Sequence, residues 1–181
     1  MSEAQHAITL RPANPTVEEG LVFARHLNEV ADGFFGLMLG KEAVSILAAA
    51  YTQPGHSYAY ENVLFAEIDG RIGGMALGFT AEQHRRFSDE PLKTAAGKHV
   101  LRMKIVKTLM ASMIRILDTI ADGDYYVLSI GLDSDLRGQG IGTRLLDAME
   151  AQAIEKGSAR IALDVAAKNE GARRLYERRG M

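Results

Sequence analysis

A run of glycines stands where a strand-like segment meets a helix-like segment. Residues 130–150 read IGLDSDLRGQGIGTRLLDAME, and the turn at their centre contains Arg137, Gly138, Gly140 and Gly142. Glycine lets backbone N–H groups come close to an anion, and the first turn of a helix offers unpaired N–H donors and a partial positive charge. The residue types at this junction therefore predict a phosphate-binding site.

The spacing of the glycines separates three kinds of phosphate-binding loop. A Walker loop requires Lys and then Ser or Thr after its last glycine, but Gly142 is followed by Thr143 and Arg144. A dinucleotide-binding G-x-G-x-x-G motif requires its third glycine where Thr143 stands. The spacing that remains is Arg-x-x-Gly-x-Gly, which begins at Arg137 and ends at Gly142.

This pattern resembles the loop that binds the pyrophosphate of acetyl-CoA in the GNAT acetyltransferase superfamily. A second segment, residues 169–181, is similar to the family's closing pattern of Asn, Ala, Leu-Tyr and Gly. The resemblance covers nearly the whole chain from Ile8 onwards. It implies a GNAT fold and an enzyme that transfers an acetyl group from acetyl-CoA directly to an amine.

The resemblance also implies a role for each matching residue. The amides of the glycine turn would hold the pyrophosphate, and the peptide groups from Ile130 to Leu132 would hold the pantetheine arm, with Gly131 compatible with a strand bulge. The amide of Leu132 would lie near the thioester oxygen. Tyr176 would give a proton to the leaving CoA thiolate, since a phenol with a pKa of about 10 is protonated at neutral pH. The predicted catalytic residue is Tyr176, and the predicted acetyl-CoA-binding residues are Ile130, Leu132, Arg137, Gly138, Gln139, Gly140, Gly142, Thr143, Asn169 and Tyr176.

Each of these residues also has a purely structural interpretation. Tyr176 shares a helical face with Ala172 and Leu175, so it can serve for packing alone. Asn169 can serve only as a helix cap, and the glycines can form a tight turn without a ligand. The functional interpretation is preferred because the residues fall on two linked motifs.

The sequence does not identify a general base. The family's usual position for it, on the fourth strand, holds Leu128, which is followed by Ser129. A catalytically silent acyl-CoA-binding sensor or interaction module therefore stays open as the alternative function. The other candidate bases, each of which also suits a solvated surface position, are Glu67, Glu82, His84 and Asp133.

Composition excludes several other classes of site. The chain has no cysteine, which excludes thiolate metal ligands and a cysteine acyl-enzyme, and its histidines show no metal-binding spacing. A net charge of −2 disfavours nucleic acid and anionic membranes as partners, and the arginines of residues 173–179 suit a helix C-terminus. We expect no metal and an acceptor that is a small-molecule amine or a protein amine. A homodimer is compatible with the sequence.

The N-terminus, MSEAQHAITL, does not have the pattern of a secretory signal. No apolar stretch approaches the roughly 20 residues that span a bilayer. We therefore expect a cytoplasmic protein and, from its 181 residues, a single acetyltransferase domain over residues 1–181.

Periodicity and turn residues predict the elements that hold these residues. The fold class is α/β with a mixed α+β character: a GNAT-like central mixed sheet flanked by helices, with a helical insertion at residues 80–124 between the third and fourth strands. The family's last strand is missing, so either the chain continues beyond Met181, which we favour, or a neighbouring chain supplies that strand. The predicted strands are residues 8–11, 63–68, 71–79, 125–132 and 159–165, and the predicted helices are residues 17–31, 41–51, 140–156 and 169–179.

Three local features carry further expectations. Thr16 and Glu19 have the spacing of a capping box at the start of the first helix. Asp69-Gly70 predicts a two-residue hairpin turn. The glycine-broken segment 31–40 is predicted to be an apolar loop that walls a pocket. Within the insertion, helical spacing is shown by Val106, Leu109, Met110, Met113, Leu117 and Ile120.

Overall fold

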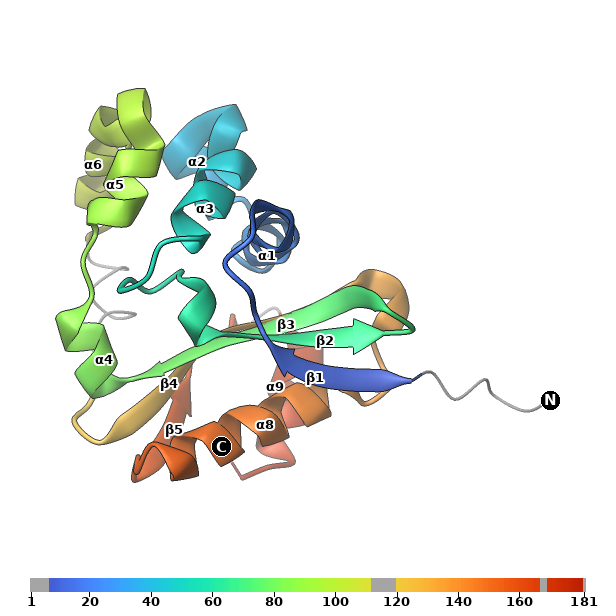
Figure 1. Cartoon of the computed structure of the whole chain (residues 1–181). Coiled ribbons are helices and arrows are strands. Elements are labelled where there is room, and N and C mark those ends of the chain that lie inside the picture. The colour runs from blue at the N-terminus through green and yellow to red at the C-terminus, as the bar shows by residue number, and fades with distance from the viewer. Residues whose placement is uncertain (1–6, 112–119, 167–168, 181) are drawn as a thin grey trace.

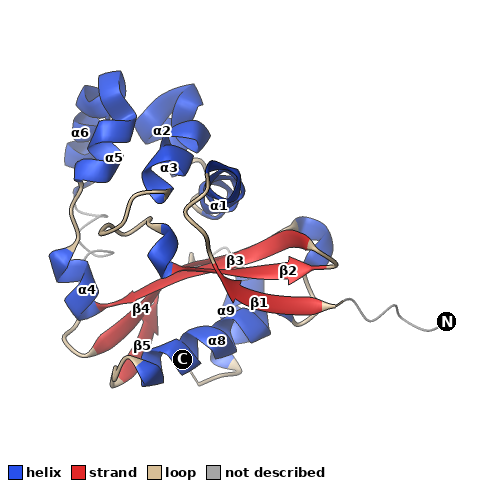
Figure 2. Cartoon of the chain, viewed as in Figure 1, coloured by secondary structure: helices blue, strands red, loops and turns tan. Residues whose placement is uncertain are grey.

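A mixed sheet with helices on both faces forms the centre of the structure, which is a computed structural model describing residues 7–111, 120–166 and 169–180. Figure 1 shows α1, α2 and α3 on one face of the sheet and α8 on the other, and Figure 2 separates the helices from the strands by colour. This is the predicted fold class. The strands, in their order across the sheet, are β1 (Ile8–Pro12), β2 (Val63–Ile68), β3 (Arg71–Thr80), β4 (Asp124–Leu132) and β5 (Arg160–Leu163).

The first four strands run antiparallel to their neighbours, whereas β4 and β5 are parallel. The β2–β3 turn is the predicted hairpin: Asp69 and Gly70 have φ values of 49° and 81°. A left-handed conformation at both residues is what a type I′ turn requires. This short local signal specifies the pairing of β2 with β3.

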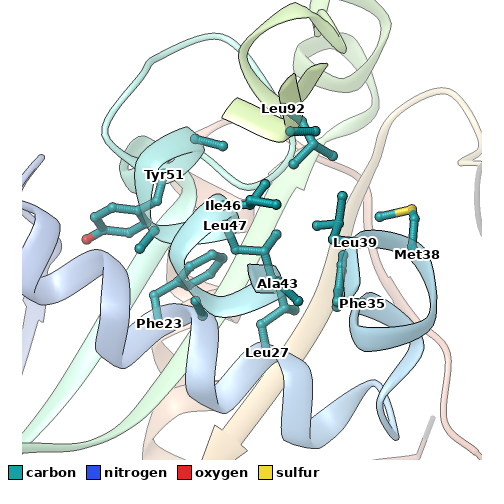
Figure 3. Close-up of a cluster of buried hydrophobic side chains, with 14 of the residues drawn as sticks. Phe23, Leu27, Phe35, Met38, Leu39, Ala43, Ile46, Leu47, Tyr51 and Leu92 are labelled. Carbon is teal, nitrogen blue, oxygen red and sulfur yellow. The ribbon is translucent and has the colours of Figure 1, made fainter. Parts of the chain in front are cut away.

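The first helical layer contains α1 (Val17–Val30), α2 (Phe34–Leu39) and α3 (Ala43–Tyr51), and α1 contacts β3 and β4. The prediction of a loop over residues 31–40 is wrong, because most of this segment is α2. Its side chains Phe35, Met38 and Leu39 are buried against α1 and α3 (Figure 3). Their i, i+3, i+4 spacing is that of a buried helical face.

The segment Phe34–Tyr51 is long and apolar enough to cross a membrane by length and composition, which the sequence analysis did not expect. Half of it is buried within the structure. It is also interrupted by a 3-10 turn (Gly40–Glu42), where Gly40 has a φ of 78°. Its apolar side chains are therefore those of two short helices that face the core.

The capping box expected at Thr16 is only half formed. The Thr16 hydroxyl accepts from the backbone N–H of Glu19 at 3.2 Å, but the Glu19 carboxylate accepts from the Asn14 N–H at 2.7 Å and from Arg11 at 3.0 Å. A complete capping box links Thr80 and Gln83, at the start of α4.

The insertion between β3 and β4 is helical, as predicted, and contains α4 (Ala81–Arg86), α5 (Glu90–Ala96) and α6 (Val100–Leu109). Val106 is buried, but Leu109 is 80% exposed and ends α6. Met113 and Leu117, which were expected to continue this helix, lie outside the described residues.

The opposite face of the sheet is covered by α8 (Ile141–Glu155), and α9 (Glu170–Glu177) follows β5. Buried side chains of α8, including Leu145 and Met149, form a second core with β2, β3 and β4. Three further 3-10 turns connect the elements at Tyr60–Asn62, Gly97–His99 and Ser134–Leu136.

Candidate active site

The parallel strands β4 and β5 are paired over only part of β4. Their register runs from Asp124 opposite Arg160 to Val127 opposite Leu163. Beyond Val127, β4 continues to Leu132 while paired, among the described strands, with β3 alone. The peptide groups of Ile130 to Leu132 therefore line an opening between the two strands.

The bulge in β4 is at Leu128, and the suggestion that it lies at Gly131 is wrong. Ser129 pairs with Leu77 and Val127 with Gly78, which leaves Leu128 as the extra residue. Gly131 has a different reason to be glycine. A Cβ there would lie 3.2 Å from a methyl of Val30 and 3.3 Å from Cβ of His26, because α1 crosses closely at this point.

The glycine turn leads directly into the N-terminus of α8. Gly138 and Gly140 have φ values of 77° and 80°, a left-handed conformation that costs an L-residue about 1–2 kcal/mol. Gly140 is the N-cap of α8, and no side chain in the described part of the chain caps this end. The first N–H groups of α8 therefore lack the side-chain acceptor that usually satisfies such donors.

A cavity of about 700 Å³, here called the turn cavity, lies against this helix end. Nine of the ten predicted acetyl-CoA-binding residues line it. Gln139 does not, because its side-chain amide turns back to donate to the carbonyl of Asp135 at 2.9 Å. The nine that the structure brings together are Ile130, Leu132, Arg137, Gly138, Gly140, Gly142, Thr143, Asn169 and Tyr176.

A second cavity of about 800 Å³, here called the aromatic cavity, adjoins the first. Its lining comes from α1, α2, the insertion, β4 and the segment after β5, and it includes Phe34 and Phe35 of the segment expected to wall a pocket. The two cavities share Ile130, Asn169 and Tyr176 among their lining residues. A molecule in one cavity can therefore meet a molecule in the other beside Tyr176.

Tyr176 is half-buried on α9 at this junction, and burial raises the pKa of its phenol. Its hydroxyl is therefore a proton donor at neutral pH. Asn169 accepts from the N–H of Ala172 at 3.1 Å, so it does cap α9, as its structural interpretation proposed. It also lines both cavities, and the two roles are compatible.

The four candidate bases differ in whether they line a cavity. Three of them line neither cavity: Glu67 pairs with Arg11 at 2.8 Å, Glu82 pairs with Arg86, and the buried Asp133 pairs with two arginines of the α1 and β3 regions. His84 is the one that lines the aromatic cavity, where it stacks on Phe79 with ring centroids 5.5 Å apart.

Two aspartates of the aromatic cavity were missed by sequence analysis. Asp32 lies in the turn after α1 with a φ of 49°, and Asp164 directly follows β5. Oδ2 of Asp164 accepts from the hydroxyl of Tyr126 at 2.7 Å. Neither residue belongs to a motif, although a polar residue at the carboxyl end of a predicted parallel strand is a usable signal.

Three of the four arginines of residues 173–179 are engaged in ion pairs within the chain, and the fourth, Arg178, lines the turn cavity. Arg173 and Arg174 pair with glutamates of α9, and Arg179 pairs with Asp147 and Glu150 of α8. These pairs offset the charge that a nucleic-acid interface would need. Among the described residues there is no group of three or more His, Cys, Asp or Glu side chains that could hold a metal ion.

The chain matches the sequence profile of the Acetyltransferase (GNAT) family over residues 40–181. It is 44% identical over 63 residues to a mycothiol acetyltransferase of Corynebacterium aurimucosum. That match covers 35% of this chain and only 20% of the relative, so the chain matches about a fifth of that protein's length.

Solved structures with the same fold include several acetyltransferases. An acetyltransferase with 27% identity gives a TM-score of 0.70 over 94% of this chain and 87% of its own. An N-acetyltransferase from Staphylococcus aureus Mu50, 20% identical, gives 0.63 over 95% and 89%. An aminoglycoside N-acetyltransferase solved in complex with CoA, 13% identical, gives 0.60 over 100% and 91%. At these last two identities the likeness concerns the fold alone.

Proposed function

The chain belongs to the GNAT acetyltransferase family, and we propose that it transfers the acetyl group of acetyl-CoA directly to an amine bound in the aromatic cavity. The observation that carries this proposal is the position of Tyr176, which lines both the turn cavity and the aromatic cavity. A donor in the first cavity and an acceptor in the second would meet at this side chain.

The turn cavity fits the donor's chemistry. A pyrophosphate needs several N–H donors, and the uncapped N-terminus of α8 with the left-handed Gly138 and Gly140 supplies them. The pantetheine arm needs peptide partners, and β4 beyond Val127 is unpaired with β5. Arg137 lines the same cavity and adds a positive charge.

The reaction that we propose needs no covalent intermediate on the protein. The neutral amine nitrogen attacks the thioester carbonyl carbon, and a C–N bond forms as the carbonyl oxygen gains negative charge. The N–H of Leu132 would stabilise that charge, as the family resemblance implies. The C–S bond then breaks, the thiolate takes a proton from the Tyr176 hydroxyl, and the nitrogen loses a proton to solvent. The Tyr176 phenolate regains a proton from solvent before the next turnover.

Calorimetric titration with acetyl-CoA and a thiol-release assay with a panel of amines test the proposal together. We expect acetyl-CoA to bind and free CoA thiol to appear only when an amine is present. Tight binding without turnover on any amine would support the alternative, a catalytically silent acyl-CoA sensor. Absence of binding would contradict both functions.

A further inference from the structure

The aromatic cavity collects most of the chain's large aromatic side chains. The chain has six phenylalanines, six tyrosines and no tryptophan, and seven of these twelve side chains line this one cavity. Aromatic faces offer a large apolar contact area and attract cations. Besides Tyr176, the seven are Phe34, Phe35, Tyr58, Phe79, Phe87 and Tyr126.

The aromatic side chains form two groups that come from different parts of the chain. In the first, Phe35 contacts Phe34 and Tyr58 edge to face, with ring centroids 5.4 and 5.5 Å apart. In the second, Phe79 contacts Phe87 edge to face at 5.0 Å and stacks on His84. Rings fixed by neighbouring rings in this way are pre-organised walls for a flat, apolar group.

The charge of the cavity lining is negative. Among its described residues, three aspartates stand against one lysine. Lys107 donates to Asp89 at 2.8 Å, so these two charges offset each other. Asp164 also lines the cavity, and an acceptor that carries a carboxylate or a phosphate would meet like charge there.

Asp164 is the carboxylate of the aromatic cavity that lies where β4 and β5 part. It follows Leu163, the last β5 residue paired with β4, and it is exposed. The hydroxyl of Tyr126 donates to Oδ2 of Asp164, which fixes the carboxylate, and Oδ1 has no donor among the described residues. An ammonium group can donate a hydrogen bond to this oxygen.

We propose that the acceptor is a primary amine that carries one positive charge and an aromatic or similarly bulky apolar body, such as an arylalkylamine. The body lies between the two aromatic groups, and the ammonium is bound by Asp164. This proposal rests on the proposed function, because it names the substrate class of the same site.

The charge of the acceptor changes during the reaction. Asp164 holds the ammonium form, which must lose one proton to solvent before its nitrogen attacks the thioester. The overall change converts R–NH₃⁺ and acetyl-CoA into the acetamide, CoA thiol and one proton. Asp164 is thus a residue that binds and orients the acceptor, and no proton needs to remain on it.

A matched series of amines tests the inference. 2-Phenylethylamine, ethylamine, phenylalanine and spermidine are compared as acceptors by thiol release, and their binding to the free protein is measured by calorimetry. We expect kcat/KM for 2-phenylethylamine to exceed that of each of the other three by about tenfold or more. Ethylamine lacks the ring, phenylalanine adds a carboxylate, and spermidine adds charge without an aromatic body. Equal or better use of any of these three would overturn the inference.

The variant Asp164→Asn tests the binding role. It keeps an oxygen that can accept from Tyr126 but removes the charge. We expect the Kd for 2-phenylethylamine to rise about tenfold, a loss of about 1.4 kcal/mol, while the Kd for acetyl-CoA stays unchanged. Asp122→Asn is the control, because this exposed carboxylate pairs with Arg85 and lines neither cavity. An unchanged amine Kd in Asp164→Asn would overturn the assignment.

The two readouts keep the two proposals apart. Suppose that acetyl-CoA binds and that the enzyme acetylates ethylamine or spermidine faster than 2-phenylethylamine. The proposed function would then stand, but the proposed substrate class would be wrong. Absence of acetyl-CoA binding would overturn the proposed function, while amine binding in calorimetry still decides whether the cavity has the chemistry proposed for it.

Discussion

The hydroxyl of Tyr126 lies 2.7 Å from Oδ2 of Asp164, and this hydrogen bond joins β4 to the residue after β5. Tyr126 pairs with Ala162 in the parallel ladder, one position before the last pair. The bond therefore bridges the two strands at the point where they part. It links the opening proposed for the donor with the carboxylate proposed to bind the acceptor.

Removing this hydrogen bond should affect the acceptor more than the donor. In Tyr126→Phe the ring keeps its contact with Phe79, at 6.1 Å between centroids, but Asp164 loses its donor. We expect the free energy of unfolding to fall by about 1 kcal/mol in urea denaturation. Steady-state kinetics should show a higher KM for the amine and an unchanged KM for acetyl-CoA.

Tyr60→Phe is the matched control, since Tyr60 packs against Tyr51 and lines neither cavity. A Tyr126→Phe enzyme whose two KM values rise equally would show that the bond supports the whole opening rather than Asp164.

Tyr176→Phe tests proton transfer to the leaving group. The ring and its packing are kept and only the hydroxyl is lost, so we expect kcat to fall about a hundredfold while the calorimetric Kd for acetyl-CoA is unchanged. Wild-type turnover in this variant would make Tyr176 a packing residue.

The pH dependence of kcat also tests whether Tyr176 donates a proton to the leaving group. Burial raises the pKa of Tyr176, so its proton-donating form is present throughout the range below the ordinary phenol pKa of about 10 and is lost only above it. Between pH 7 and 9.5, loss of the Tyr176 proton should therefore cause no decline in kcat. The profiles of the unaltered enzyme and of Tyr176→Phe should have the same shape over this range.

The sequence allowed most of the donor side to be predicted, because that side is encoded locally. The glycine turn, the helix after it and Asn169 as a cap each depend on residues within one short segment. Gly138 and Gly140 do adopt the left-handed conformation for which glycine is suited. Nine of the ten predicted residues consequently line one cavity.

The acceptor side was not predictable in the same way, because it is assembled from distant segments. Asp164 and Tyr126 are 38 positions apart, and only the parallel pairing brings them together. The segment containing α2 was misread because its glycines suggested a loop. Gly33 and Gly40 are the N-cap and C-cap of α2, both with a φ of 78° that glycine adopts readily, and Phe35, Met38 and Leu39 between them are buried in the core.

Two glycines of the turn should respond differently to alanine. At Gly142 a Cβ would lie 3.5 Å from Leu132 and 3.8 Å from Leu175, ordinary contacts that the fold accepts. At Gly140 the φ of 80° would strain any L-residue by about 1–2 kcal/mol. We therefore expect Gly142→Ala to keep its unfolding free energy in urea and to weaken acetyl-CoA binding about tenfold in calorimetry, because its methyl group enters the turn cavity.

Gly140→Ala should instead lose stability. If the turn were only a structural feature, Gly142→Ala would bind acetyl-CoA as tightly as the unaltered chain.

Close packing of α1 on α3 makes Gly20 sensitive to any side chain. A Cβ at Gly20 would lie 2.7 Å from the carbonyl oxygen of Ala48 and 3.1 Å from the Tyr51 ring, so α1 would have to move. We expect Gly20→Ala to lower the free energy of unfolding by about 1–3 kcal/mol in urea denaturation. Gly36→Ala is the control, because a Cβ there meets nothing within 4 Å and alanine favours the helix of α2. Equal stabilities of the two variants would contradict this account of the packing.

His56 should make stability depend on pH. Its Nε2 donates to the carbonyl of Ala50 at 2.9 Å and its Nδ1 accepts from the N–H of Tyr58 at 3.3 Å, a combination that only the neutral ring can make. Burial accordingly lowers the pKa of His56 below its ordinary value of about 6.5.

The sign of the effect follows from proton uptake. Below pH 6.5 the unfolded chain binds a proton at His56 that the folded chain does not bind, so this stability is complete above pH 6.5 and is lost as the pH falls. Urea denaturation between pH 7.5 and 5.5 should show the free energy of unfolding falling, with His56 contributing up to about 1.4 kcal/mol per pH unit below 6.5. His56→Gln should be less stable at pH 7.5 and should lack that part of the slope. An unchanged slope in this variant would assign the pH dependence to other groups.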